Sequence, residues 1–204
     1  MSMKESIRIV PGGENGEVAI VEFDMAGEKV NKFNTPMMAR LKEVIGELRS
    51  SKFKVIIFKS SKNKIFIAGA DIDEIKAMTT KEQFEKAVLA GQDIFNELED
   101  LSIPSIAAIH GACAGGGCEF IMACDYRIAS DDKSTRIGLP ETKLGIIPGF
   151  GGCIRMPRIL GLQNALGIIL AGKLETAQKA GKIGLVDQVC HPDILMEQAL
   201  IKAQ

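Results

Sequence analysis

Residues 105–125 read SIAAIHGACAGGGCEFIMACD, and they carry the clearest structural pattern in this 204-residue chain. Residues 105–109 are a short apolar run behind Pro104, which is typical of a buried strand. Glycines 115–117 follow, and residues 118–125 form an apolar segment compatible with a helix. A strand, a glycine turn and a helix in this order point backbone N–H groups at the space above the turn. A tight turn that merely needs small residues explains the glycines equally well.

Strands and helices are expected to alternate on both sides of this stretch. The patterns predict strands at 7–10, 17–24, 55–58, 65–67, 126–129 and 185–189, and helices at 35–48, 79–98, 153–160, 163–170, 176–180 and from Pro192 onward. Thr35 is the expected N-cap of the first helix, and Thr79 with Glu82 forms a capping-box pattern for the second. This alternation predicts a single α/β domain.

The composition excludes several classes of protein. The chain is 46% apolar and 25% charged with a formal net charge of −1, so it has no overall positive charge to attract nucleic acid. No run is long enough for a membrane-spanning helix, and no signal-peptide core is present. The five cysteines contain no CxxC pair, which argues against a zinc site or a disulfide framework. We expect a cytoplasmic protein with reduced thiols.

Two glutamates are the candidate acid and base. Glu119 follows the glycine turn, and Glu141 follows Pro140 in a second turn-rich segment. Two carboxylates that face one pocket can divide acid and base duties if their surroundings separate their pKa values. Each glutamate alone is more often a solvated surface group.

The two glycine-containing turns, at residues 68–69 and 115–117, could each supply one backbone N–H to an oxyanion. Neither turn contains the G-x-G-x-x-G or the G-x-x-x-x-G-K-[ST] pattern, so both are poor phosphate loops.

Other reactive side chains have simpler explanations. His110, at a strand end, is expected to be structural, and Cys118 and Cys124 are expected to be inert packing thiols. Asp71 with its acidic neighbours 73 and 74 could suggest a metal, but a helix cap and a solvated face explain them better. No metal site is predicted.

Four blocks of the sequence resemble the enoyl-CoA hydratase/isomerase (crotonase) superfamily. They are IFIAGADI (65–72), HGACAGGGCE (110–119), LPETKLGIIPG (139–149) and GKIGLVD (181–187), in the order in which the family has them. The resemblance implies an α/β fold with a β-β-α spiral core, flanking helices and a site for an acyl-CoA thioester.

The resemblance also implies roles for individual residues. It places the oxyanion hole at the N–H groups of Ala68 and Gly116, assigns Glu119 to the attacking water and assigns Glu141 to the proton delivered to Cα. Coenzyme A is expected along Phe66, Ala68, Gly69, Ala70, Asp71 and Ile72. It is the carrier of the substrate, and no further cofactor is implied.

The stretches 24–31 and 157–161 are more narrowly similar to the N-terminal domain of multifunctional fatty-acid oxidation α-subunits. We therefore expect a catalytic core at residues 1–190, with residues 191–204 starting a C-terminal helix that continues in a longer protein. A downstream 3-hydroxyacyl-CoA dehydrogenase domain, a thiolase subunit and further copies of the chain are the implied partners. Cys153 and Ile154 depart from the Thr-Gln usual in the family.

Hydration of trans-2-enoyl-CoA in β-oxidation is the function that two glutamates favour. An isomerase that moves the double bond between positions 3 and 2 needs only one acid/base and stays open. So does a non-catalytic acyl-CoA-binding or assembly domain. Nucleotide binding at the glycine turns has the weakest support.

Overall fold

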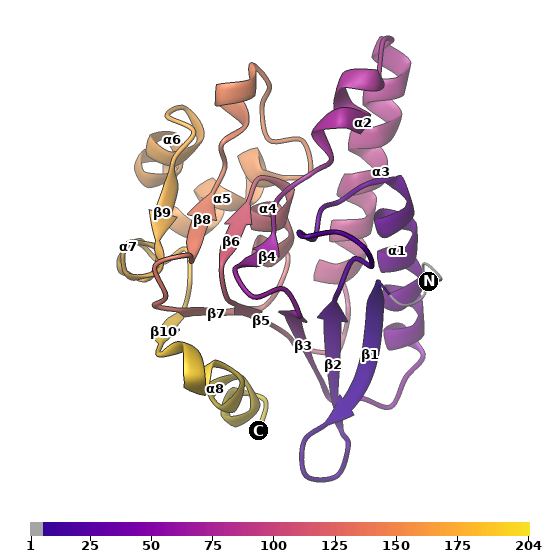
Figure 1. Ribbon diagram of the computed structural model, residues 1–204, viewed down its shortest axis with the longest axis vertical. Coiled ribbons are helices and arrows are strands. Elements are labelled where there is room, and N and C mark those ends of the chain that lie inside the picture. Colours follow the sequence, from indigo (N-terminus) through magenta and orange to yellow (C-terminus); the bar gives the residue numbers. More distant parts are fainter. Residues whose placement is uncertain (1–5) are drawn as a thin grey trace.

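The computed structural model describes residues 6–204 and contains two β-sheets with helices packed around them (Figure 1). The larger sheet has the strand order β1-β2-β3-β5-β7-β10. Its strands are β1 Ile7–Gly12, β2 Val18–Phe23, β3 Val55–Ser60, β5 Ser105–Ile109, β7 Tyr126–Ser130 and β10 Gln188–Cys190. The β1–β2 hairpin is antiparallel, and the remaining pairs in this sheet are parallel. Strand β1 continues through Pro11, which an edge strand tolerates.

The smaller sheet has the order β4-β6-β8-β9, with β4 Ile65–Ile67, β6 Ala112–Ala114, β8 Arg136–Gly138 and β9 Leu174–Thr176. The chain passes from β3 to β4, from β5 to β6 and from β7 to β8 through short connections, each time moving from the larger sheet to the smaller one. Helices follow each of these pairs. This repeat is the β-β-α spiral that the family resemblance implied. Of the four short strands in the smaller sheet, the sequence patterns predicted only β4.

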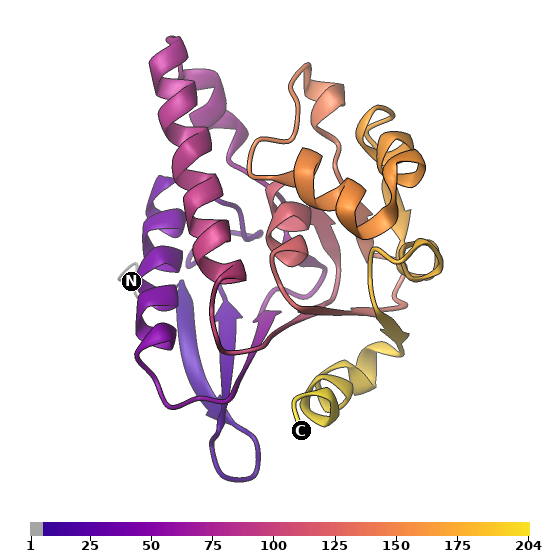
Figure 2. The ribbon, with the colours of Figure 1, turned by 180° about the vertical axis from the view of Figure 1, so that it is seen from behind.

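Eight α-helices are present in residues 6–204. They are α1 Thr35–Arg49, α2 Ile72–Ala77, α3 Lys81–Glu99, α4 Gly116–Met122, α5 Gly152–Leu160, α6 Leu162–Ile169, α7 Ala177–Ile183 and α8 Leu195–Lys202. The 3₁₀ helices η2 Glu141–Leu144 and η3 Pro192–Ile194 lie before α5 and α8. Seen from behind, the long helix α3 runs beside α1 on one flank (Figure 2).

The helix starts correct two predictions by one residue each. The N-cap of α1 is Asn34, whose side chain accepts from the backbone N–H of Met37, and not Thr35. The capping box of α3 pairs Thr80 with Gln83, and not Thr79 with Glu82. Both corrected caps are equally good chemically, since Asn caps as well as Thr and Gln closes a box as well as Glu. The last strand is also shorter than expected, because β10 begins at Gln188.

Helix α4 lies at the centre of the core, and every one of its residues is buried. The ring of Phe120 contacts five other phenylalanine rings at centroid distances of 5.0–6.5 Å: Phe23, Phe33, Phe58, Phe66 and Phe95. Such pairs each stabilise by about 0.5–1.5 kcal/mol beyond the area they bury. This cluster fixes the helix that carries Glu119.

Helix α8 packs on the larger sheet. Leu195 and Ala199 are buried against Ile57, Ile106 and Ile128 in a second apolar cluster. The predicted helix after Pro192 is thus present, whereas the division of the chain at residue 190 stays a prediction. None of the helices in the described chain combines the length and the apolar character needed to cross a membrane.

Candidate active site

Glu119 is buried in the first turn of α4, where only 2% of its surface is exposed. One carboxylate oxygen, Oε1, accepts hydrogen bonds from the backbone N–H groups of Phe150 and Gly152, both at 2.8 Å. These two donors lie in a second glycine loop, residues 147–152, just before and at the start of α5. The carboxylate is therefore oriented through one oxygen, and the sequence prediction that places Glu119 at a helix start is confirmed.

Gly115 and Gly117, in the turn at residues 115–117, are each required for a different physical reason. Gly115 has a φ of +54°, which an L side chain rarely adopts, and a Cβ there would lie 3.0 Å from Oε1 of Glu141. At Gly117 a Cβ would collide with the carbonyl oxygen of Ile67. The small residues thus serve tight packing and also bring the second carboxylate close to the turn.

Glu141 is the first residue of η2, and 8% of its surface is exposed. Its Oε2 is buried and has no hydrogen-bond partner within residues 6–204. A buried oxygen without a partner is costly and uncommon in native structures, so it marks a site where a ligand could bind.

Burial raises the pKa of both carboxyl groups. The pKa of Glu119 rises from 4.5 to about 7, chiefly because of burial, and the charge of Glu141 raises it further. The N–H groups of Gly152 and Phe150 and the charge of Arg155 oppose this rise. The pKa of Glu141 is raised by burial as well. A carboxyl whose pKa lies near neutral pH, as that of Glu119 does, can act as a general acid or base, and the raised pKa of Glu141 favours the same use.

The Ala68 N–H, which was assigned to the oxyanion hole, donates to the carbonyl of Asn31 at 2.8 Å. This bond corrects the assignment, since a paired donor is not free to receive a substrate oxygen.

Ala70 has a free N–H close by. It forms a parallel bridge with Phe33, in which its neighbours at 69 and 71 make the hydrogen bonds and its own N–H faces the other way. A Cβ on Gly116 would lie 3.4 Å from the Ala70 nitrogen. Neither the Ala70 nor the Gly116 N–H has an acceptor in the described part of the chain. These two donors therefore lie close together at the glycine turn of residues 115–117.

Comparisons with known proteins show the family of this chain. Residues 13–204 match the family model described as enoyl-CoA hydratase/isomerase. The chain belongs to the enoyl-CoA hydratase/isomerase family. It is 43% identical over 180 residues to the fatty acid oxidation complex subunit alpha of Vibrio parahaemolyticus, a match that spans 88% of this chain and 26% of that protein. The chain therefore spans about a quarter of that relative.

Solved structures of the family share the fold. The enoyl-CoA hydratase of Bacillus anthracis has 33% sequence identity and a TM-score of 0.89, covering 97% of this chain and 75% of that one. The enoyl-CoA hydratase of Thermoplasma volcanium has 28% identity and a TM-score of 0.87, covering 98% of this chain and 77% of that one.

The segment proposed to bind coenzyme A is partly committed to other contacts. Phe66 is fully buried, and its carbonyl accepts from the side chain of Asn31. Asp71 caps α2, as predicted, and pairs with Lys32 at 2.9 Å. Gly69 lies against the carbonyl of Ala114, whereas Ile72 is 43% exposed. The coenzyme A path along these residues stays a prediction.

Three residues that support the candidate site were not linked to it in the sequence analysis. Asn31 is fully buried and donates to the carbonyls of Phe23 and Phe66 and to Ser60, while its Oδ1 accepts from Met25. Its neighbourhood had been noted only as part of the resemblance at 24–31. Phe150 and Arg155 were not linked to Glu119, because nothing in the sequence shows which carboxylate a loop N–H will meet.

The predictions for His110, Cys118 and Cys124 agree with the structure. His110 forms a hydrogen bond with Ser130 at 2.9 Å. Cys118 and Cys124 are buried free thiols, and burial raises the pKa of both. Within residues 6–204, no group of three or more His, Cys, Asp or Glu side chains is arranged to hold a metal ion.

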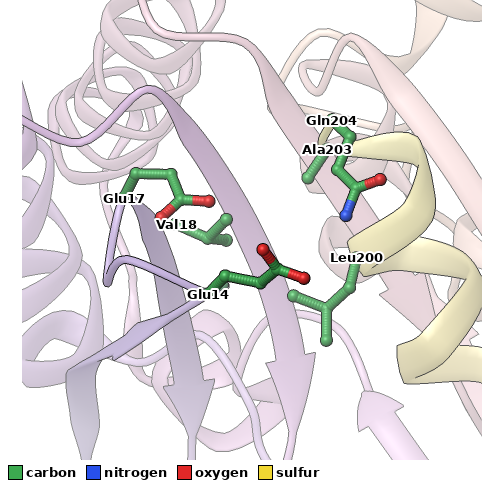
Figure 3. Close-up of a pocket in the computed structure, with 7 residues that line it drawn as sticks. Glu14, Glu17, Val18, Leu200, Ala203 and Gln204 are labelled. Atoms are coloured by element: carbon green, nitrogen blue, oxygen red, sulfur yellow. The ribbon is translucent and has the colours of Figure 1, made fainter.

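Open cavities do not mark this site. One, of about 310 Å³, lies between the turn of the β1–β2 hairpin and the end of α8, with Glu14 and Leu200 on its two sides (Figure 3). Another, of about 410 Å³, is lined by residues that include Lys59, His110 and Met196. Neither is lined by Glu119 or Glu141, so the buried carboxylates and free N–H groups identify the site.

Proposed function

We propose that this chain hydrates trans-2-enoyl-CoA to 3-hydroxyacyl-CoA. The observation that carries the proposal is the pair of buried carboxyl groups with raised pKa values, Glu119 and Glu141, beside the free N–H groups of Ala70 and Gly116. Membership of the enoyl-CoA hydratase/isomerase family supports the same class of substrate.

The two N–H groups of Ala70 and Gly116 would bind the thioester carbonyl oxygen. As water adds to the β-carbon, negative charge moves onto this oxygen, and the intermediate is an enolate. Donors aimed at such an oxygen stabilise the developing charge more than the ground state, and loss of one typically lowers the rate about 10²–10³-fold.

The two carboxyls would divide the proton transfers. Glu119, held through Oε1, presents Oε2 to a water and takes its proton as the water oxygen bonds to the β-carbon. Glu141 gives a proton from its unpartnered Oε2 to the α-carbon of the enolate. We expect both carboxyls to approach the double bond from one side, so that both parts of water add to the same face.

Coenzyme A is the carrier of the substrate in this proposal, and no additional cofactor takes part. Its adenine and pantetheine would follow the backbone from Ala70 to Ile72, at the start of α2. Small residues at 68–70 let a ligand approach this backbone closely.

Isomerisation of 3-enoyl-CoA is the second candidate in the same pocket. Glu141 favours it, because one carboxyl with a raised pKa and an unpartnered oxygen could move a proton between two carbons without a water. This reaction would not require Glu119.

We place the reaction in fatty-acid β-oxidation, because a relative that is 43% identical is named as a subunit of a fatty acid oxidation complex. The 3-hydroxyacyl product would pass to a 3-hydroxyacyl-CoA dehydrogenase domain and then to a thiolase subunit in the cytoplasm. Further copies of the chain could take part in such an assembly.

The test uses the full-length protein and crotonyl-CoA, whose enone absorbance disappears on hydration. Turnover that is lost in Glu119→Gln supports the proposal. Conversion of 3-enoyl-CoA without any hydration would favour the isomerase, and binding of acyl-CoA without either reaction would favour a non-catalytic binding domain.

A further inference from the structure

The guanidinium of Arg155 is one of the most constrained groups near the site. Arg155 lies on α5 and is 6% exposed. Its Nη2 donates to Asn96 at 2.7 Å and to Glu99 at 2.6 Å, and its Nε donates to the same Glu99 oxygen at 2.9 Å. Its Nη1 donates to the carbonyl oxygen of Phe150 at 3.1 Å. One side chain thus joins α3 to the second glycine loop.

Helix α3 holds this loop at neighbouring points as well. Gln92 donates to the carbonyl of Gly149 at 2.7 Å, and the ring of Phe95 packs edge-on against Phe150 at 5.6 Å. Gly91 leaves the space that the Phe150 ring occupies, since a Cβ there would collide with it. Helix α3 therefore holds both the backbone at Gly149 and the side chain of Phe150.

The backbone of Phe150 connects Arg155 to the candidate base through two successive peptide groups. The carbonyl of Phe150 accepts from Arg155, while the N–H of Phe150 donates to Oε1 of Glu119 at 2.8 Å. Gly151 has a φ of +109° and no room for a Cβ beside Nη1 of Arg155, so the loop needs glycine there. A single residue thus connects the guanidinium to the carboxylate.

Charge acts along the same path. Arg155 lowers the pKa of Glu119, against burial and against Glu141 from η2, which both raise it. The thiols of Cys118 on α4 and Cys153 on α5 also face the two carboxyls, and burial keeps their pKa values raised, so both are neutral. Removal of Arg155 should therefore raise the pKa of Glu119, because one of the groups that lower it would be lost.

We propose that Arg155 is a positioning residue for the hydration reaction, held by Asn96 and Glu99 so that the backbone of Phe150 keeps Glu119 in its working orientation. This inference rests on the proposed hydratase function. It assigns α3, which carries none of the candidate catalytic groups, to the support of the base.

The decisive variant is Arg155→Met, which removes the charge and the donors. We expect kcat to fall roughly 10- to 100-fold while KM changes less, because misplacement of a base by a fraction of an ångström weakens proton transfer. We also expect the acid limb of the kcat/KM profile to move to higher pH, because the charge of Arg155 lowers the pKa of Glu119. Arg155→Lys keeps the positive charge but loses the planar set of guanidinium donors. Its acid limb should therefore stay near that of the wild type while kcat falls.

Arg127→Met is the matched control. Arg127 is also a buried arginine, paired with Asp187 at 2.9 Å and donating to the carbonyl of Cys124 at 2.9 Å, away from both carboxylates. It should lose stability without a shift of the acid limb. A folded Arg155→Met protein with a wild-type acid limb and kcat within about twofold of wild type would overturn the proposal. If Arg155→Met does not fold, the test relies on Arg155→Lys, and a kcat equal to that of the wild type in this variant overturns the proposal.

A readout that does not depend on turnover separates this inference from the proposed function. Carboxyl ¹³C NMR of the full-length protein gives the pKa of Glu119 directly, with its signal assigned by its loss in Glu119→Gln. If the wild-type protein catalyses neither hydration nor isomerisation of enoyl-CoA, the proposed function is wrong. The pKa of Glu119 must still be higher in Arg155→Met than in the wild type, with no such rise in Arg127→Met, and an unchanged value would overturn the link.

Discussion

The backbone N–H of Gly152 donates to Oε1 of Glu119 at 2.8 Å, across 33 positions of the chain. A Cβ at position 152 would lie 2.9 Å from the same oxygen, so glycine is needed for the approach. The contact brings the first glycine turn and the second glycine loop together. It also leaves Oε2 of the carboxylate for a ligand.

Substitution of each glutamate by glutamine should separate the two candidate reactions. Both Glu119→Gln and Glu141→Gln should lower hydration of crotonyl-CoA by about 10²–10⁴-fold, because an acid/base group is lost in each. Only Glu141→Gln should also abolish isomerisation of 3-enoyl-CoA. Steady-state assays with the two substrates check this, and equal loss of isomerisation in both variants would contradict the division of roles.

The stability of the protein should decrease as the pH rises through the titration of Glu119. Its folded pKa of about 7 lies above its ordinary 4.5, so between these values the unfolded chain binds fewer protons. The loss of folding free energy that comes from ionising the buried Glu119 is absent below pH 4.5 and complete above pH 7, where it reaches about 3 kcal/mol. Glu119→Gln should therefore be more stable than the wild type at pH 8 by up to that amount.

Urea unfolding at pH 4.5 and pH 8 measures this difference. The exposed Glu14→Gln should follow the wild type at both values, because its carboxylate has no hydrogen bond or ion pair within residues 6–204. A Glu119→Gln variant with the same pH dependence as the wild type would show that burial does not raise this pKa.

Gly116→Pro should remove an oxyanion donor with little damage to the helix. Gly116 is the first residue of α4, a position where proline is tolerated because its N–H has no helical acceptor. Hydration should fall about 10²–10³-fold. Gly116→Ala adds a Cβ in the same place, 3.4 Å from three neighbours, but keeps the N–H. If Ala and Pro at this position lose activity equally, crowding and not the donor is responsible.

The N–H groups at 68 and 70 should behave differently in solution. Ala68 is hydrogen-bonded to Asn31, so its amide should exchange slowly in the free protein. Ala70 and Gly116 should exchange faster and become protected when acetoacetyl-CoA binds. Residue-resolved ¹H–¹⁵N spectra of the full-length protein with and without the ligand check this. Protection of neither amide on binding would remove both from the oxyanion hole.

The sequence by itself determined the alternation of strands and helices, the buried strand Ser105–Ile109, the glycine turn and the two glutamates. These features depend on local properties, since apolar periodicity, capping residues and glycine act within a few positions. The β-β-α spiral followed from resemblance, because strands such as Ala112–Ala114 and Arg136–Gly138 have only three residues each and carry too little periodicity to be recognised.

Only the tertiary structure decided which groups of the site are free. Whether the N–H at 68 or at 70 can meet a substrate depends on Asn31, which lies 37 positions before Ala68 and takes the Ala68 N–H through packing of distant segments. The raised pKa of Glu119 arises in the same way, because its burial and its neighbours Glu141 and Arg155 exist only once α4, η2 and α5 have come together. Local chemistry placed the reactive residues in the sequence, and long-range hydrogen bonds and burial set what each of them can do.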